Sequence, residues 1–148
     1  MTADERGVRL LAALRHAVDD LGRYEREVSR SRLESDGDAW RMVRQALQEA
    51  IQACIDLAHV LLADMDAEPV DTYRGAFDAL RVHADLPPDL AMKLSAAAGL
   101  RNVLLHVYTE LDLGLIHEAY TTEREHLAQF AAWAASRMAR EDGNPVGS

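Results

Sequence analysis

The sequence predicts an all-α protein, an up-and-down bundle of about five helices. Of its 148 residues, 49% are hydrophobic and 28% are charged, a balance typical of a chain that folds around a core. Aromatic residues make up only 5% of the chain, whereas strands are usually rich in aromatic and β-branched side chains. Apolar side chains also recur every three or four positions, which is the spacing of one helical face.

The first two helices follow from this spacing and from the polar segment between them. A helix is expected over residues 4–30, and a loop over residues 31–38, which contain serine, glycine and aspartate. Asp38 is the predicted N-cap of the second helix, since its carboxylate can accept hydrogen bonds from free backbone N–H groups. That helix has apolar side chains from Trp40 to Leu62 on one side. Its other side is polar, with Gln45, Gln48, Gln52, Asp56 and His59.

Three further helices are predicted in the second half of the chain. Residues 64–71, which include Pro69, form a linker before a short helix over about residues 72–82. Pro87 and Pro88 open the next helix, which runs to about residue 108, because proline is tolerated in a first turn. Asp112 is expected to cap the last helix. A single domain therefore covers residues 1–142, and residues 143–148 are an expected disordered tail.

Features of the chain as a whole favour a cytoplasmic protein without membrane association. Cys54 is its single cysteine, so no internal disulfide can form, and its apolar surroundings predict a small buried side chain. The first residues show no basic segment followed by an apolar one, and we expect no apolar run long enough to span a bilayer.

The charge distribution limits the kind of anionic ligand that the chain can bind. The net charge is −9. Residues 1–48 hold nine arginines and nine acids, whereas residues 49–148 hold seven basic and sixteen acidic residues. An excess of basic side chains is needed for broad, non-specific nucleic-acid binding. Any anionic substrate is therefore expected to be held locally, by a few basic groups.

One segment, residues 99–108, combines residue types that suit phosphate chemistry. Arg101 and Tyr108 are seven positions apart and share one helical face, while Asn102 and His106 are four apart and share another. Histidine can remove or donate a proton near neutral pH. A guanidinium can bind phosphate oxygens through two parallel hydrogen bonds. These residues would suit RNA cleavage without a metal or cofactor.

The number of catalytic groups predicts a two-fold dimer, in which two histidines provide the acid and the base. The spacing alone does not decide between this chemistry and ordinary structural roles. A solvated arginine, a histidine at a helix end and a half-buried tyrosine would explain the same residues.

The segments around these residues resemble the HepT-like toxins of the HEPN ribonuclease superfamily. The resemblance covers about residues 39–138 and includes the complete motif R-x4-H-x-Y, with asparagine directly after the arginine. The matching stretches are residues 47–58, 73–77, 86–90 and 98–108.

This resemblance implies a HEPN-like helical bundle that dimerises, and the toxin of a toxin–antitoxin module that acts as a metal-independent endoribonuclease on mRNA or tRNA. Arg101 would bind phosphate, His106 would be the acid and base, and Asn102 would orient the site. The partner would be an MNT-type nucleotidyltransferase antitoxin, which neutralises the toxin by AMPylation of Tyr108. Val107 departs from the basic residue that often follows the motif histidine, which predicts a narrow substrate range or a weak nuclease.

Two other classes of function are open at this stage. A metal-binding bundle would use Asp56 with His59 and Glu123 with His126, which have carboxylate-x-x-His spacing. Both pairs lie in polar runs, which favours solvated faces instead. A non-catalytic HEPN-like module would bind only a nucleotide or a partner protein, since a motif is not itself an activity.

Overall fold

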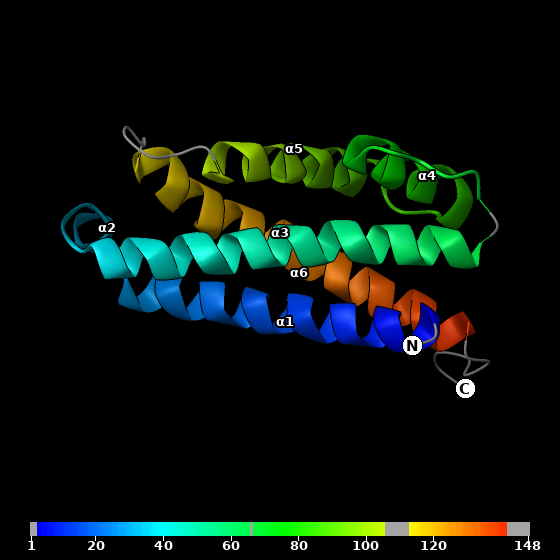
Figure 1. Ribbon diagram of the computed structural model, residues 1–148, viewed down its shortest axis with the longest axis horizontal. Helices are drawn as coiled ribbons and strands as arrows, with labels where there is room; N and C mark the ends of the chain where they lie inside the picture. The colour runs from blue at the N-terminus through cyan, green and yellow to red at the C-terminus, as the bar shows by residue number, and fades with distance from the viewer. Residues whose placement is uncertain (1–2, 66, 106–112, 142–148) are drawn as a thin grey trace.

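The computed structural model describes residues 3–65, 67–105 and 113–141 (Figure 1). Within these ranges the chain forms six helices and no strand, which confirms the all-α prediction. The helices are α1 (Ala3–Glu27), α2 (Arg30–Ser35), α3 (Gly37–Asp64), α4 (Tyr73–Ala84), α5 (Pro88–Leu105) and α6 (Leu113–Glu141). In Figure 1, α1 and α3 run antiparallel, α4 and α5 lie along the other side of α3, and α6 crosses behind them.

Helix α3 is the central element of the bundle, because it contacts each of the other five helices. Many of its apolar side chains are buried, and Leu47, Ile51 and Leu57 are at most 1% exposed. Cys54 is also buried, as predicted, and burial raises the pKa of its thiol well above the usual range. By length and composition α3 could cross a membrane, so the expectation that no apolar run was long enough was wrong. However, 67% of its most apolar window is buried inside the bundle, as in the core helix of a folded domain.

The predicted loop over residues 31–38 is wrong in part, because α2, from Arg30 to Ser35, covers most of it. Ser29 caps this short helix by accepting a hydrogen bond from the Arg32 backbone N–H at 3.1 Å. Leu33 is only 2% exposed, so one buried side chain anchors a turn that is otherwise polar. Tertiary burial, which local composition does not reveal, therefore fixes α2.

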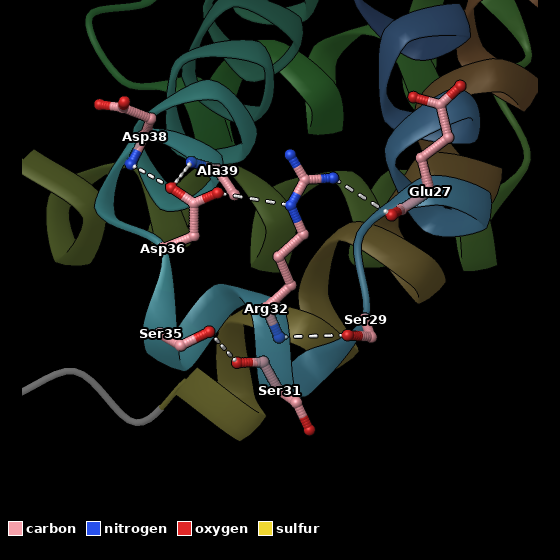
Figure 2. Close-up of polar contacts among 8 residues, drawn as sticks. All are labelled: Glu27, Ser29, Ser31, Arg32, Ser35, Asp36, Asp38 and Ala39. Carbon is pink, nitrogen blue, oxygen red and sulfur yellow. Dashed lines mark hydrogen bonds and ion pairs between the residues drawn. The ribbon is translucent and has the colours of Figure 1, made fainter.

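The N-cap of α3 is Asp36 rather than the predicted Asp38. Figure 2 shows its Oδ1 accepting hydrogen bonds from the backbone N–H groups of Asp38, at 3.0 Å, and Ala39, at 3.3 Å. Arg32 lies between the two long helices: its Nε donates to Asp36 Oδ2 and its Nη1 to the Glu27 carbonyl oxygen, each at 3.4 Å. The same arginine thereby joins the end of α1 to the start of α3.

These contacts predict a pH-dependent contribution of Asp36 to stability. The backbone N–H of Ala39, followed by that of Asp38 and by the Arg32 side chain, lowers the pKa of the Asp36 carboxyl below its usual value. The charged form is therefore favoured in the folded state, and its stabilisation is lost as the pH falls through the lowered pKa. Asp36→Asn keeps a good cap without the charge, so we expect a lower Tm than wild type at neutral pH. The difference should shrink below about pH 4. Parallel Tm curves over the whole pH range would contradict this account.

The turn between α4 and α5 sets the direction of α5. Asp85 follows α4 with a left-handed backbone, φ 58°, and the Leu86 N–H donates to the Leu80 carbonyl oxygen at 3.2 Å. Leu80 and Leu86 are both buried, as is usual where a helix ends in this way. The turn sends α5 back along α4 and against α3. It thereby brings the end of α5 that carries Arg101 close to the polar side of α3.

Candidate active site

Arg101 lies in the C-terminal part of α5 and reaches across to α3. Its side chain is half-buried, and Nη1 donates a hydrogen bond of 2.7 Å to Oε1 of Gln52. The two residues are 49 positions apart in the sequence, so only the packing of α5 against α3 brings them together. The predicted phosphate-binding residue is therefore held by a second side chain, on a different helix.

Gln52 is itself held by Asp56, one helical turn further along α3. Its Nε2 donates to Asp56 Oδ1 at 2.9 Å, and both side chains are half-buried. A guanidinium can only donate hydrogen bonds and an ionised carboxylate can only accept them, so the amide can satisfy both in just one orientation. Arg101, Gln52 and Asp56 thus form a hydrogen-bonded chain, which we call the Arg101 brace.

Part of the Arg101 guanidinium has no protein partner among the residues that the structure describes. Nε is buried without a hydrogen bond, and Nη2 makes none within the described ranges. No described carboxylate forms an ion pair with this arginine either. Nε and Nη2 form the edge of a guanidinium that presents two parallel N–H groups to an oxyanion. A phosphate would give this edge the acceptor that the described part of the protein does not provide.

A small recess lies beside this arginine. Gln48, Glu49, Gln52 and Arg101 line it, and its volume is about 260 Å³. The Glu49 carboxylate accepts a hydrogen bond of 2.8 Å from Gln45 Nε2. Ligand pockets usually have volumes of about 300–1,000 Å³, so this recess is of a size that suits a small group such as a phosphate.

The other predicted site residues are only partly covered by the structure. Asn102 follows Arg101 on α5 and is exposed, with no side-chain hydrogen bond to a described residue. His106 and Tyr108 lie outside the described residues, as do the predicted N-cap Asp112 and the predicted tail, residues 143–148. The structure therefore places Arg101 and Asn102 on one helix. It adds Gln52 and Asp56, which lie on the polar side of α3 and which sequence spacing does not connect with Arg101.

A larger hollow, of about 940 Å³, lies between α4 and α5. Arg74 and Arg81 line it from α4, and Met92 and Ser95 line it from α5. Arg81 Nη2 is paired with Asp78 at 2.7 Å. Neither Arg101 nor Asn102, the two predicted site residues that the structure describes, lines this hollow, so size alone does not identify the active site.

Three of the four residues of the metal-binding alternative, Asp56, Glu123 and His126, make hydrogen bonds within their own helices. Asp56 accepts the hydrogen bond from Gln52, and Glu123 Oε2 lies 3.1 Å from Nδ1 of His126 on the same helix. Across residues 3–65, 67–105 and 113–141, no three His, Cys, Asp or Glu side chains are grouped so that they could hold one ion. The described residues thus lend that alternative no support.

Solved structures with this arrangement of helices define the class of fold. An AMPylated HEPN toxin from Shewanella oneidensis, in complex with an MNT antitoxin, matches with a TM-score of 0.77 at 22% identity, covering 90% of this chain and 97% of that one. A toxin–antitoxin structure with AMP-PNP matches with a TM-score of 0.77 at 22% identity, covering 87% and 96%. YutE from Bacillus subtilis, a cytosolic protein of unknown function, matches with a TM-score of 0.79 at 14% identity, covering 97% and 94%. At these identities the matches establish a shared fold, the HEPN-like helical bundle.

The family is shown by a separate comparison. The family model described as ribonuclease HepT-like matches residues 14–132, most of the chain. The chain therefore belongs to the ribonuclease HepT-like family, which confirms the resemblance seen in residues 39–138. No curated protein matches it.

Proposed function

We propose that this protein is the toxin of a HepT/MNT-type toxin–antitoxin module and acts in the cytoplasm as a metal-independent endoribonuclease. Membership of the ribonuclease HepT-like family supports the reaction class. The observation that carries the proposal is the state of Arg101. Its guanidinium is half-buried, held by the neutral Gln52, and has no ion pair with a described carboxylate. An arginine whose charge is left unpaired beside a small recess is suited to bind phosphate.

In the proposed reaction the ribose 2′-oxygen attacks the neighbouring phosphorus and the bond to the 5′-oxygen breaks. The 2′-hydroxyl loses its proton to a histidine, and the leaving 5′-oxygen gains a proton from a second acid. His106 supplies these groups from the two subunits of a homodimer. Arg101 stabilises the negative charge that develops on the phosphate oxygens, and Asn102 orients the site. The 2′-oxygen serves as the nucleophile, so the reaction needs no metal ion or cofactor.

Tyr108 is the proposed regulatory residue. An MNT-type nucleotidyltransferase antitoxin would transfer AMP from ATP onto its phenolic oxygen and release pyrophosphate. The adenylate adds a negative charge and a bulky group two positions from His106, which would repel and block an incoming RNA phosphate. The solved relative from Shewanella oneidensis is an AMPylated HEPN toxin bound to an MNT antitoxin, which supports the same form of control here.

The test is the intact mass of the protein after co-expression with an MNT-type nucleotidyltransferase encoded beside it. We expect a mass increase of one or more AMP units, together with loss of RNA cleavage. Tyr108→Phe should show neither change, while Tyr24→Phe, at a half-buried tyrosine of α1, should behave like wild type. AMP addition that persists in Tyr108→Phe would assign the modification to another residue. No addition to the wild-type protein would contradict control by AMPylation.

A further inference from the structure

The brace on Arg101 shows how the proposed active site keeps its positive charge in place. We propose that Gln52, oriented by Asp56, is a positioning residue that holds the Arg101 guanidinium at the angle needed to bind the scissile phosphate. This inference rests on the proposed ribonuclease function, and it concerns residues outside the motif on α5.

The position of Gln52 follows from the helical spacing of α3. Gln48, Gln52 and Asp56 are four residues apart and form one stripe, and all three are half-buried on a helix whose other faces are mostly buried and apolar. Arg101 meets this stripe at its middle residue. An arginine side chain has several rotatable bonds, and fixing them keeps the guanidinium aligned with the charge that develops on the phosphate in the transition state. A hydrogen bond of 2.7 Å to a neighbouring helix provides such a restraint.

The amide of Gln52 is important because it is neutral and leaves the positive charge of Arg101 unpaired by any described carboxylate. A carboxylate at position 52 would form an ion pair with Arg101 and would offset the charge that a phosphate requires. Gln52 accepts the hydrogen bond from Nη1 and adds no charge of its own. The guanidinium is thereby held in one orientation while its full positive charge remains available to the ligand.

Asp56 determines which end of the Gln52 amide faces the arginine. Without an acceptor at Nε2, the amide could turn and present its NH₂ group to the guanidinium, which would place two donors together. The hydrogen bond of 2.9 Å from Nε2 to Asp56 Oδ1 prevents this. The Asp56 carboxylate is separated from the guanidinium by the length of the amide, so it orients Gln52 and does not pair with Arg101.

The brace also determines which atoms of Arg101 remain for the substrate. Gln52 occupies Nη1, whereas Nε and Nη2, which have no hydrogen-bond partner among the described residues, lie on the other edge. A buried donor without an acceptor is destabilising, so a phosphate oxygen that reaches Nε relieves a cost already present in the folded protein. Part of the binding free energy is thereby specific to an oxyanion in the recess beside Gln48 and Gln52.

The kinetic test compares four variants on a single-stranded RNA substrate. Gln52→Leu removes the hydrogen bonds at similar size, and Gln52→Glu keeps an acceptor but adds a charge. A misplacement of about 1 Å can cost roughly 100-fold in rate, so we expect both to lower kcat by roughly 10- to 100-fold with little change in KM. Asp56→Leu removes the acceptor that orients the Gln52 amide, so it should also lower kcat, by less than Gln52→Leu does. The control is Gln45→Leu, because Gln45 lies on the same helix but contacts Glu49 and not Arg101.

A second measurement does not depend on cleavage. The Nε–H resonance of Arg101, assigned by its loss in Arg101→Lys, is followed by NMR during addition of an RNA oligonucleotide. The 2′-hydroxyl groups of this RNA are methylated, so it binds but cannot be cleaved. In wild type and Gln45→Leu we expect a single resonance that shifts on binding. In Gln52→Leu it should be broadened and shift less. Suppose that the wild-type protein cleaves RNA and that Gln52→Leu has the same kcat and the same Arg101 resonance as wild type. That result would overturn this inference and leave the proposed function intact. A wild-type protein that cleaves no RNA would instead overturn the proposed function, and with it the reaction that Gln52 is proposed to serve.

Discussion

Arg101→Ala is expected to lower kcat for RNA cleavage by roughly 100- to 1,000-fold, the usual loss when one group that stabilises transition-state charge is removed. The substitution removes the positive charge beside the recess and every donor that could meet a phosphate. Gln52 loses its contact with α5, but it is half-buried and keeps its hydrogen bond to Asp56. The fold should therefore persist, as circular dichroism would show. Cleavage of an end-labelled single-stranded RNA gives the rate.

Two further variants make this prediction specific. Arg101→Lys keeps a charge but loses the planar fork, so we expect an intermediate rate. Arg74→Ala removes a different arginine, which lines the hollow between α4 and α5 and does not line the recess beside Arg101. It should cleave like wild type. If Arg101→Ala cleaved as fast as wild type, the arginine would have no catalytic part, and a bundle that only binds its partner would become the better account.

Phe77→Ala is expected to destabilise the protein by roughly 3–5 kcal/mol, the range for removing a buried aromatic side chain. Phe77 is 1% exposed and joins α4 to the core. Its ring packs edge-to-face with that of Phe130, with ring centroids 5.8 Å apart and an interplanar angle of 88°. Phe130 in turn stacks on Trp133, with ring centroids 5.7 Å apart and an interplanar angle of 22°. Because the total stability of a domain is about 5–15 kcal/mol, this loss would remove a large part of it.

Urea unfolding followed by circular dichroism measures this effect. The matched control is Val82→Ala, on the same helix but 57% exposed, for which we expect a change within about 0.5 kcal/mol. Equal losses in the two variants would mean that α4 is not held by its buried face. A small loss in both would mean that α4 adds little to the core.

The sequence predicted the long helices well because their apolar residues repeat over many turns. The periodic stripes of α1, α3 and α6 each continue for more than twenty residues, and no local feature competes with them. Helix α2 was missed because its six residues include one apolar side chain, Leu33, whose burial depends on the surrounding helices. The cap at Asp36 was missed for a different reason. Asp36 and Asp38 are both suitable N-cap residues, and residue type alone does not choose between them.

The candidate site was predictable only where its residues lie close together in the sequence. Arg101 and Asn102 belong to a motif within one helix, which local spacing can reveal. Gln52 and Asp56 carried a weaker signal, an amide and a carboxylate four residues apart on a helix. That spacing predicts a contact between the two, but it does not say that an arginine 49 residues away completes the set. This information resides in the angle at which α5 crosses α3.

The left-handed turn at Asp85 and the Arg101 brace hold α5 near its two ends. Backbone amides in the last turn of a helix usually exchange their hydrogens fastest, because the helix opens from its ends. Here the bond from Arg101 to Gln52 opposes that opening, so a phosphate that binds the other edge of the guanidinium would also steady the end of α5. Exchange rates in this last turn should therefore depend on whether phosphate occupies the recess, and local stability would become a measure of substrate binding.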